Sequence, residues 1–315
     1  MRKILLKDST LREGLDVPGV RFSLRQKLTI ARLLHDAGVP EIEVVAPAKV
    51  FDDLAFLKKL NKTGSHPKTS GLVYAHKPGC RDEIEALSVH IDRIDVLMPV
   101  SCQRKPYSKK TKISLLLDIL DFASRFSFEV GAGFPHSFQT DLGFLSKISC
   151  QAIKHGAGRI TIYDTNGGAD PFTVYQTISR LKKQLRVPIL FHAHNDLGLA
   201  TANCLAAVCA GADALDVTVN GLGDRAGNAA LEQAAMILRL KKFETGIRLQ
   251  SLRRLAEAVE KMSGVRRSKL APIVGEYIYA HMSPAHLENP GLFLAFDPRI
   301  MSPGIKRKGH GDSRR

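Results

Sequence analysis

The feature that most constrains the fold of this chain is a repeated alternation of short apolar runs with longer amphipathic segments. Each run has the length and the apolar, often β-branched composition of a buried strand. Between the runs lie helix-like segments, such as Leu24–Ala37, whose apolar residues share one helical face. The eight runs are Ile4–Leu6, Ile42–Val45, Gly71–Val73, Ile94–Leu97, Phe128–Val130, Arg159–Ile162, Pro188–Phe191 and Leu215–Val219.

Eight such units over about 240 residues match the size of an α/β protein built as a (β/α)8 TIM barrel. The alternative is an open, doubly wound sheet, which needs a glycine-rich phosphate loop after its first strand. Here the first run is followed by Asp8-Ser9-Thr10-Leu11-Arg12-Glu13-Gly14, which is no such loop. We therefore predict a barrel over residues 1–260.

Composition excludes several other classes. The 315 residues are 44% hydrophobic, which is incompatible with disorder as the main state, and no apolar stretch is long enough to span a membrane. The five cysteines are odd in number and show no C-x-x-C spacing, which argues against a disulfide framework and a cysteine zinc site. We expect a cytoplasmic protein with reduced thiols and no membrane contact.

The net charge of +15 allows two interpretations. One is a surface for nucleic acid, but no recognisable binding motif accompanies the basic residues, which are spread over the chain. The other is a solvated surface that also suits anionic small molecules. We favour the second and expect no nucleic-acid partner.

Polar residues follow the predicted strands, where a TIM barrel carries its functional groups. We expect these side chains to converge on one rim of the barrel. They are Asp8 to Gly14 after the first strand, His76 after the third, Ser101 after the fourth, Asp164-Thr165-Asn166-Gly167 after the sixth, His192 to Asp196 after the seventh and Asn220 to Asn228 after the eighth.

His192 and His194 are two residues apart at the end of an apolar strand, so both rings point to the same face. Together with Glu13 they suit a divalent metal ion, and the ligand types allow Mg²⁺, Mn²⁺, Zn²⁺, Co²⁺ or Fe²⁺. A hydrogen-bonded pair of histidines that caps the strand is the alternative. We expect Asp8 and Asp196 to orient neighbouring groups, such as a histidine or an arginine, rather than to bind the metal.

Arg12 adjoins Glu13, which places a fixed positive charge beside the predicted metal. A metal and an arginine on one rim can hold an oxyanion such as an enolate or a carboxylate. An ion pair that closes the barrel mouth is the alternative role for Arg12. The three glycines within residues 221–228 form either a tight loop or a place where backbone N–H groups approach a ligand.

Three long motifs resemble the signatures of the DRE-TIM metallolyase superfamily, and within it the Claisen-condensing synthases: homocitrate, 2-isopropylmalate and citramalate synthase. The second and third motifs look closest to homocitrate synthase of the nitrogen-fixation type. The motifs are Asp8 to Gly14, Phe191 to Asn203 and Val217 to Asn228.

The resemblance implies a condensation used in amino-acid biosynthesis, in which the enolate of acetyl-CoA attacks the keto carbon of a metal-bound 2-oxo acid and hydrolysis releases CoA. By matching positions, Glu13, His192 and His194 would bind the metal, with Asn228 close to it. Arg12 would stabilise the enolate or keto oxygen, and Thr165 would bind the substrate carboxylate. We expect His76 and Ser101 to contribute to substrate binding.

The resemblance also implies a lid. Residues 271–276 and 280–286 look like the family's lid segment, so we assign residues 261–315 to a shortened C-terminal lid and dimerisation segment. Its second histidine, His286, would be the catalytic acid/base, often reaching the neighbouring subunit's site. A homodimer follows from that.

Several positions depart from the synthase pattern. Leu15 and Asp16 replace a usual Glu-Gln, Gly133 lies where an acid is usual after the fifth strand, and Met282 replaces a lid glutamate. Beyond the lid, Lys308-Gly309-His310-Gly311 hints at the usual Gly-Lys-His-Ser-Gly segment, with no regulatory domain after it. We expect either a 2-oxo acid other than 2-oxoglutarate or an impaired condensation.

Two other functions remain open. A lyase or aldolase of the same superfamily is one, although the 3-hydroxy-3-methylglutaryl-CoA lyases carry a cysteine in the loop after the eighth strand and residues 221–228 have none. A non-catalytic homologue that binds metal or keto acid is the other.

Overall fold

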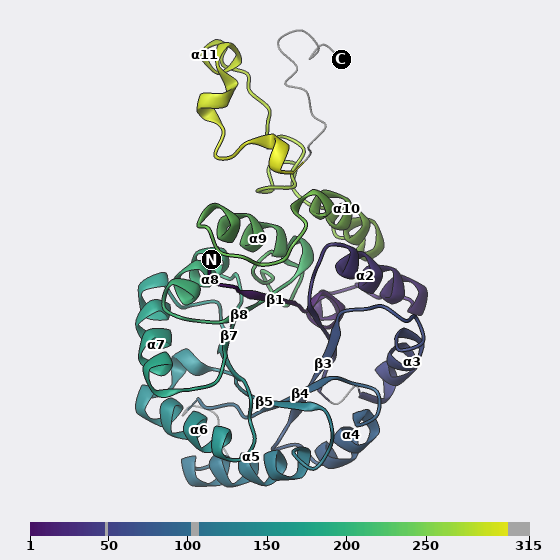
Figure 1. The fold of residues 1–315 in the computed structure, drawn as a ribbon, viewed down its shortest axis with the longest axis vertical. Helices are drawn as coiled ribbons and strands as arrows, with labels where there is room; N and C mark the ends of the chain where they lie inside the picture. Colours follow the sequence, from purple (N-terminus) through teal and green to yellow (C-terminus); the bar gives the residue numbers. More distant parts are fainter. Residues whose placement is uncertain (48–49, 102–106, 302–315) are drawn as a thin grey trace.

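The computed structural model describes residues 1–47, 50–101 and 107–301, and it confirms the (β/α)8 barrel (Figure 1). Eight parallel strands pair in chain order, and β8 pairs back onto β1, so the sheet closes. The strands are β1 (Leu5–Asp8), β2 (Glu41–Val45), β3 (Lys68–Tyr74), β4 (Arg93–Leu97), β5 (Glu129–Phe134), β6 (Ile160–Asp164), β7 (Ile189–Ala193) and β8 (Ala214–Val217).

Helices cover the outside of the barrel and alternate with the strands. Polar side chains cap several of them: Ser23 and Gln26 form a reciprocal capping box on α2, and Asp141 and Asp170 cap α6 and α7. The helices are α1 (Thr10–Glu13), α2 (Leu24–Asp36), α3 (Val50–Leu60), α4 (Cys80–Leu87), α5 (Lys109–Ala123), α6 (Leu142–Lys154), α7 (Pro171–Gln184), α8 (Ala200–Cys209), α9 (Leu231–Leu240), α10 (Leu252–Ser263) and α11 (Pro284–Glu288).

The fifth strand is longer than its apolar run indicates. It continues through Gly131, Ala132 and Gly133, although glycine disfavours strands. Tertiary contacts explain these glycines: a Cβ at Gly131 would lie 1.8 Å from Oδ1 of Asp95. Small residues are needed on β5 because side chains of β4 fill the space in front of it.

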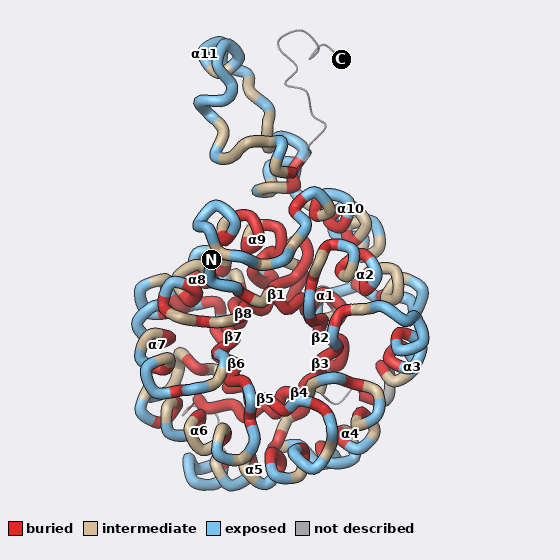
Figure 2. Tube along the Cα trace, in the orientation of Figure 1, coloured by how far each residue is buried: buried red, intermediate tan, exposed pale blue. Residues whose placement is uncertain are grey.

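The apolar core lies between the barrel wall and the helices, which leaves the strands buried on both faces (Figure 2). The inside of the barrel is different, since it holds a network of charged side chains that are also shielded from solvent. The barrel therefore has an apolar outer layer that stabilises the fold and a polar interior that is available for chemistry.

Beyond α10 the chain leaves the barrel as an arm, defined here as residues 264–301. In Figure 1 the arm, which carries α11, projects away from the barrel. It is mostly exposed (Figure 2), and Met282 and Leu292 are more than 80% exposed. Among its contacts with the barrel domain, Arg253 of α10 donates to the carbonyl of Gly275. The C-terminal tail with its basic residues, 306–315, and the segment Lys308-Gly309-His310-Gly311 noted in the sequence lie outside the described residues.

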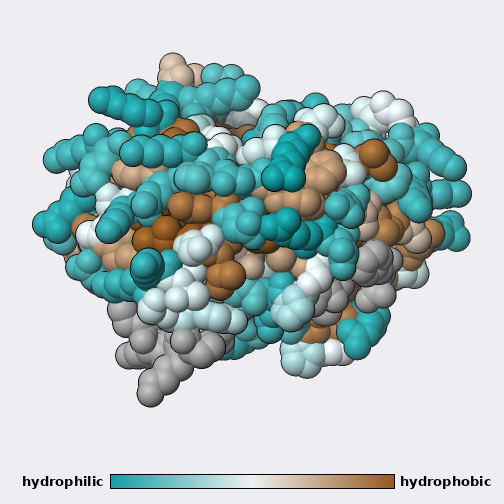
Figure 3. Space-filling view, turned by 90° about the horizontal axis from the view of Figure 1, so that it is seen from below, coloured by the Kyte–Doolittle hydropathy of each residue, from teal (hydrophilic) through white to brown (hydrophobic). Residues whose placement is uncertain are grey.

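One face of the molecule is mainly hydrophilic. Figure 3 shows charged and polar residues over much of the face turned to the viewer, with apolar residues between them. Among the described residues, no helix is both long and apolar enough to cross a lipid bilayer.

Candidate metal centre

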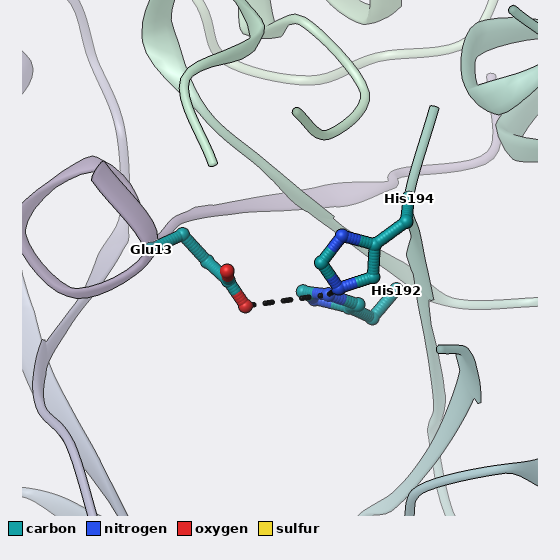
Figure 4. A group of neighbouring side chains, drawn as sticks. All are labelled: Glu13, His192 and His194. Carbon is teal, nitrogen blue, oxygen red and sulfur yellow. Dashed lines mark hydrogen bonds and ion pairs between the residues drawn. The ribbon is translucent and has the colours of Figure 1, made fainter. Parts of the chain in front are cut away.

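Glu13, His192 and His194 come together at the mouth of the barrel, with their side chains pointing toward one another (Figure 4). Glu13 ends the single turn α1 after β1, whereas His192 lies in β7 and His194 follows it. One potential ligand atom from each residue lies within 4.8 Å of the other two. All three residues are buried, so the cluster has the composition and spacing of a metal site with positions left for water or substrate.

The ring of His192 is oriented by an acidic residue on the next strand. Its Nδ1 donates to Oδ2 of Asp216 at 2.9 Å, so Nε2 is the ring nitrogen that faces the other residues of the cluster. That Nε2 lies 3.5 Å from Oε1 of Glu13 and 3.2 Å from Nε2 of His194. The hydrogen bond to Asp216 thus presents the correct nitrogen of His192 to a metal.

His194 is suited to the same role because it stays neutral. Burial, followed by the nearby His192 and Arg225, lowers the pKa of His194 to about 3. Its Nδ1 is a buried atom without a hydrogen-bond partner in the described part of the chain. A neutral imidazole is the form that binds metal ions.

Asn228 lies against the same cluster. Its amide nitrogen is 3.1 Å from Nε2 of His192, and its Oδ1 is buried without a partner among the described residues. This approach depends on Gly223, because a Cβ there would lie 1.6 Å from Oδ1 of Asn228. The glycine-rich loop after β8 therefore brings Asn228 to the predicted metal position.

Arg12 is held between two carboxylates. It donates from Nε to Glu43 at 2.6 Å and from Nη1 to Glu13. Although burial opposes its charge, these two acids raise the pKa of Arg12 well above its ordinary value. Arg12 is therefore both the fixed charge beside the cluster and a member of an ion pair at the barrel mouth, the two roles that the sequence left open.

A buried lysine connects the two halves of the site. Lys7 of β1 contacts Glu43 and lies 3.1 Å from Oδ2 of Asp216. Burial opposes its charge, yet Asp216 and Glu43 raise its pKa above the usual range. Lys7 is thus a permanent cation that touches the partner of Arg12 and the partner of His192.

The charges inside the barrel are largely paired. Below the cluster Arg159 forms a two-pronged pair with Glu41 and a 2.7 Å bond to Asp95, and Arg93 lies 3.8 Å from Glu41. Among these described residues four cations face five carboxylates, a formal charge of −1, which is compatible with a cation at the cluster. The cations are Lys7, Arg12, Arg93 and Arg159, and the carboxylates are Glu13, Glu41, Glu43, Asp95 and Asp216.

Other predicted residues lie on the rim but make different contacts. Asp8 accepts from the backbone N–H and hydroxyl of Thr10, not from a histidine or arginine as expected. Asp196 accepts from Arg225 at 2.7 Å. Thr165 accepts from the backbone N–H of His136, and its carbonyl accepts from Arg225. Asp8 and Asp196 therefore order the rim loops, and Arg225 links Thr165 to Asp196.

His76 and Ser101 follow β3 and β4 as predicted. The His76 ring makes edge contacts with Tyr74 and Tyr107, at centroid distances of 5.2 and 6.1 Å. Ser101 is buried, and its carbonyl accepts from Nζ of Lys112 at 2.7 Å. Their part in substrate binding stays a prediction.

His286 lies on α11 in the arm, where its ring stacks on Phe293 at 3.9 Å between centroids. The arm projects away from the barrel of its own chain (Figure 1), so this chain does not bring His286 to its own metal cluster. Met282, on the same arm, is 88% exposed.

Sequence reasoning missed Lys7, Glu43, Asp216 and Tyr163, which all lie inside the barrel. The available signal was weak. Each of the four is a single charged or polar residue within an otherwise mainly apolar strand, and side chains along a strand alternate between its two faces. Which of them meet across the barrel depends on the pairing register of the strands, and a single sequence does not reveal that register.

This fold and cluster define a barrel protein with a candidate metal centre at the C-terminal ends of its strands. The family model described as HMGL-like matches residues 3–259, and the chain belongs to this family of DRE-TIM metallolyases. Among similar curated proteins, homocitrate synthase 1 of Nostoc sp. is 35% identical over 95% of this chain and 81% of its own length. 2-Isopropylmalate synthase 2 of Caldanaerobacter subterraneus subsp. tengcongensis is 34% identical over 98% of this chain and 81% of its own.

Solved structures with a similar fold include the HMG-CoA lyase of Bacillus subtilis. It superposes with a TM-score of 0.75, covers 87% of this chain and 97% of its own, and is 21% identical. At that identity the similarity establishes the shared barrel fold and not the reaction. The sequence relatives and the structural neighbours thus include enzymes with different reactions built on one architecture.

Proposed function

We propose that the protein catalyses a metal-dependent condensation of acetyl-CoA with a 2-oxo acid. The observation that carries the proposal is the buried cluster of Glu13, His192 and His194 with Arg12 bonded to Glu13. The relatives named as homocitrate and isopropylmalate synthases support the condensation reaction over the lyase reaction. The glycine loop supports it too, because residues 221–228 lack the cysteine that the resemblance associates with the lyases.

The chain's own residues would prepare the site in the following way. Asp216 fixes the ring of His192, and Arg12 fixes the carboxylate of Glu13. A divalent cation held by Glu13, His192 and His194, with Asn228 beside them, would supply Lewis-acid activation of the 2-oxo acid. Arg12 keeps a positive charge next to the reacting oxygen atoms, and Thr165 lies on the rim for the substrate carboxylate.

The general acid/base in this proposal is His286 of a second copy of the chain. A position on an exposed arm that leaves its own barrel is compatible with that role. The protein would then work as a homodimer whose arms exchange between subunits, and residues 261–315 would form the lid segment.

A thiol-release assay tests the proposal. Metal-loaded protein is incubated with acetyl-CoA and, in turn, pyruvate, 2-oxoisovalerate, 2-oxoglutarate, oxaloacetate and glyoxylate. We expect CoA release with at least one acid, and loss of both bound metal and CoA release in Glu13→Ala and His192→Ala. Full activity without metal in either variant would contradict the mechanism.

The same preparation tests the lyase alternative. Incubation with 3-hydroxy-3-methylglutaryl-CoA would yield acetoacetate from a lyase and no product from a condensing synthase. Acetoacetate formation, with no CoA release from acetyl-CoA in the presence of any of the five acids, would replace the proposed reaction with cleavage. Neither product, in a protein that binds the metal, would favour a non-catalytic homologue.

A further inference from the structure

Tyr163 of β6 points into the barrel beside the metal cluster. Its ring lies 4.9 Å from the ring of His192, centroid to centroid, and packs against Leu72 and Leu97 from β3 and β4. The residue is 5% exposed. A side chain that starts on β6 and contacts β3, β4 and β7 residues crosses the interior at the level of the site.

The hydroxyl of Tyr163 has no hydrogen-bond partner among the residues that the structure describes, and it is shielded from solvent. Buried tyrosine hydroxyl groups usually have a partner, because a buried donor without one loses the bond it made to water. A polar group that is left without a partner beside a functional cluster indicates that a ligand supplies the missing acceptor.

The backbone of β5, the strand that neighbours β6, leaves room for the ring of Tyr163. A Cβ on Gly133 would lie 3.0 Å from Cε2 of Tyr163 and 3.3 Å from its hydroxyl, and 2.4 Å from Cδ2 of Leu97. Any larger residue at position 133 would displace both side chains. The glycine found in place of the usual acid therefore makes room for the phenol, and the two leucines restrict its movement.

A tyrosine hydroxyl is protonated over the working range of pH, so the hydroxyl of Tyr163 can act as a hydrogen-bond donor.

We propose that Tyr163 is a catalytic residue whose hydroxyl donates a hydrogen bond to the carbonyl oxygen of the bound 2-oxo acid. This inference rests on the proposed function. That oxygen gains negative charge as the carbonyl carbon is attacked, and a fixed neutral donor stabilises the charge without giving up its proton. The hydroxyl of Tyr163 would be a further hydrogen-bond donor to this oxygen. The guanidinium of Arg12 has fewer N–H groups left for it, because Arg12 already donates to Glu13 and Glu43.

The test is Tyr163→Phe, which removes the hydroxyl and keeps the ring, with Tyr175→Phe on the exposed face of α7 as the matched control. Mn²⁺-loaded proteins are titrated with each of the five 2-oxo acids by calorimetry. We expect unchanged Mn²⁺ content, about tenfold weaker binding of the preferred acid and, with acetyl-CoA, a fall in kcat of about 100-fold. The Tyr175 variant should match the wild type in all three.

Thermal stability separates this role from a structural one. Removal of an unpartnered buried hydroxyl should leave the Tm of the ligand-free protein unchanged or slightly higher, while a hydroxyl that holds the fold together would lower it. Because the chain contains no Trp, tyrosine absorbance can also be followed directly. The preferred acid should produce a difference spectrum in the wild type that Tyr163→Phe lacks.

Each outcome decides between the two proposals. Wild-type affinity and kcat in Tyr163→Phe would overturn the role of Tyr163 even if CoA release confirms the condensation. Weaker binding and a lost difference spectrum in a protein that releases no CoA would keep the contact with the acid and overturn the proposed reaction. Failure of the wild type to bind any of the five acids would overturn both.

Discussion

Asp216 is the residue that determines which nitrogen of His192 faces the metal position. Its carboxylate accepts from Nδ1 of His192 and is itself ionised, because Lys7 and the His192 bond hold its pKa well below the usual range against the effect of burial. We predict that Asp216→Asn lowers metal affinity about 10–100-fold. Titration calorimetry with Mn²⁺ measures the change.

The chain offers a control for this variant. His155 and Asp121 form the same kind of pair, at 2.8 Å, on the surface between α5 and α6. Asp121→Asn should leave metal affinity unchanged. Equal effects of the two substitutions would show that the loss does not come from the orientation of His192.

Lys7 should contribute to the free energy of unfolding, because it neutralises two buried carboxylates. Its removal takes away the cation between Glu43 and Asp216, and Arg12 then remains as the cation paired with Glu43. We predict that Lys7→Met reduces the free energy of unfolding by about 3–5 kcal/mol, measured by urea denaturation. The matched control is Lys182→Met, which breaks the partly exposed pair with Asp213 and should cost less than about 1 kcal/mol.

Glu232 should make stability depend on pH. Burial raises the pKa of this α9 carboxyl from 4.5 to about 7. The folded state then holds a proton that the unfolded state releases, so its contribution to stability falls as pH rises from about 4.5 to 7. We predict that Glu232→Gln increases the free energy of unfolding above pH 7, by up to about 3 kcal/mol, and has little effect near pH 4.

Denaturation curves at pH 4.5 and pH 8 check this prediction. Glutamine keeps an oxygen that can accept from the backbone N–H of Asn220, the present partner of Glu232. An equal effect of the substitution at both pH values would contradict the pKa-based explanation.

At the scale of elements, the loop after β8 positions Asn228 through the absence of a side chain at Gly223. We predict that Gly223→Ala displaces Asn228 and lowers metal affinity about tenfold, with the barrel intact by circular dichroism. Gly168→Ala is the matched control, since a Cβ there meets nothing within 4 Å. Unchanged metal affinity in Gly223→Ala would show that Asn228 does not contribute to metal binding.

The eight strands could be predicted from the sequence because each buried strand is a short apolar run with a turn on either side. The pair His192 and His194 could also be predicted to share a face, because side chains alternate along a strand. The end of β5 could not, since Gly131 and Gly133 favour a turn locally and are selected by Asp95, Leu97 and Tyr163 from neighbouring strands. Local sequence determines where the strands form. Which side chains meet inside the barrel depends instead on contacts between strands that are distant in the sequence.

At the scale of the whole molecule, the proposed exchange of arms can be tested by mixing two inactive variants. Under the proposal, Glu13→Ala should keep His286 but lose the metal, whereas His286→Ala should keep the metal and lose turnover. Co-expressed in equal amounts, they should recover about a quarter of wild-type activity, because half of the dimers are mixed and each holds one complete site. No recovery in mixed dimers would place His286 in its own subunit's site or outside the reaction.

Closure of the barrel has a consequence for the order of assembly. Glu13 follows the first strand, and the residue that orients His192 lies in the last, so Lys7 and Asp216 meet only when β1 pairs with β8, across 209 positions of sequence. During synthesis Lys7 cannot pair with Asp216 until β8, the last strand of the barrel, has been synthesised. We therefore predict that metal binding requires β1 to pair with β8, so a refolding chain should acquire metal no faster than its barrel closes.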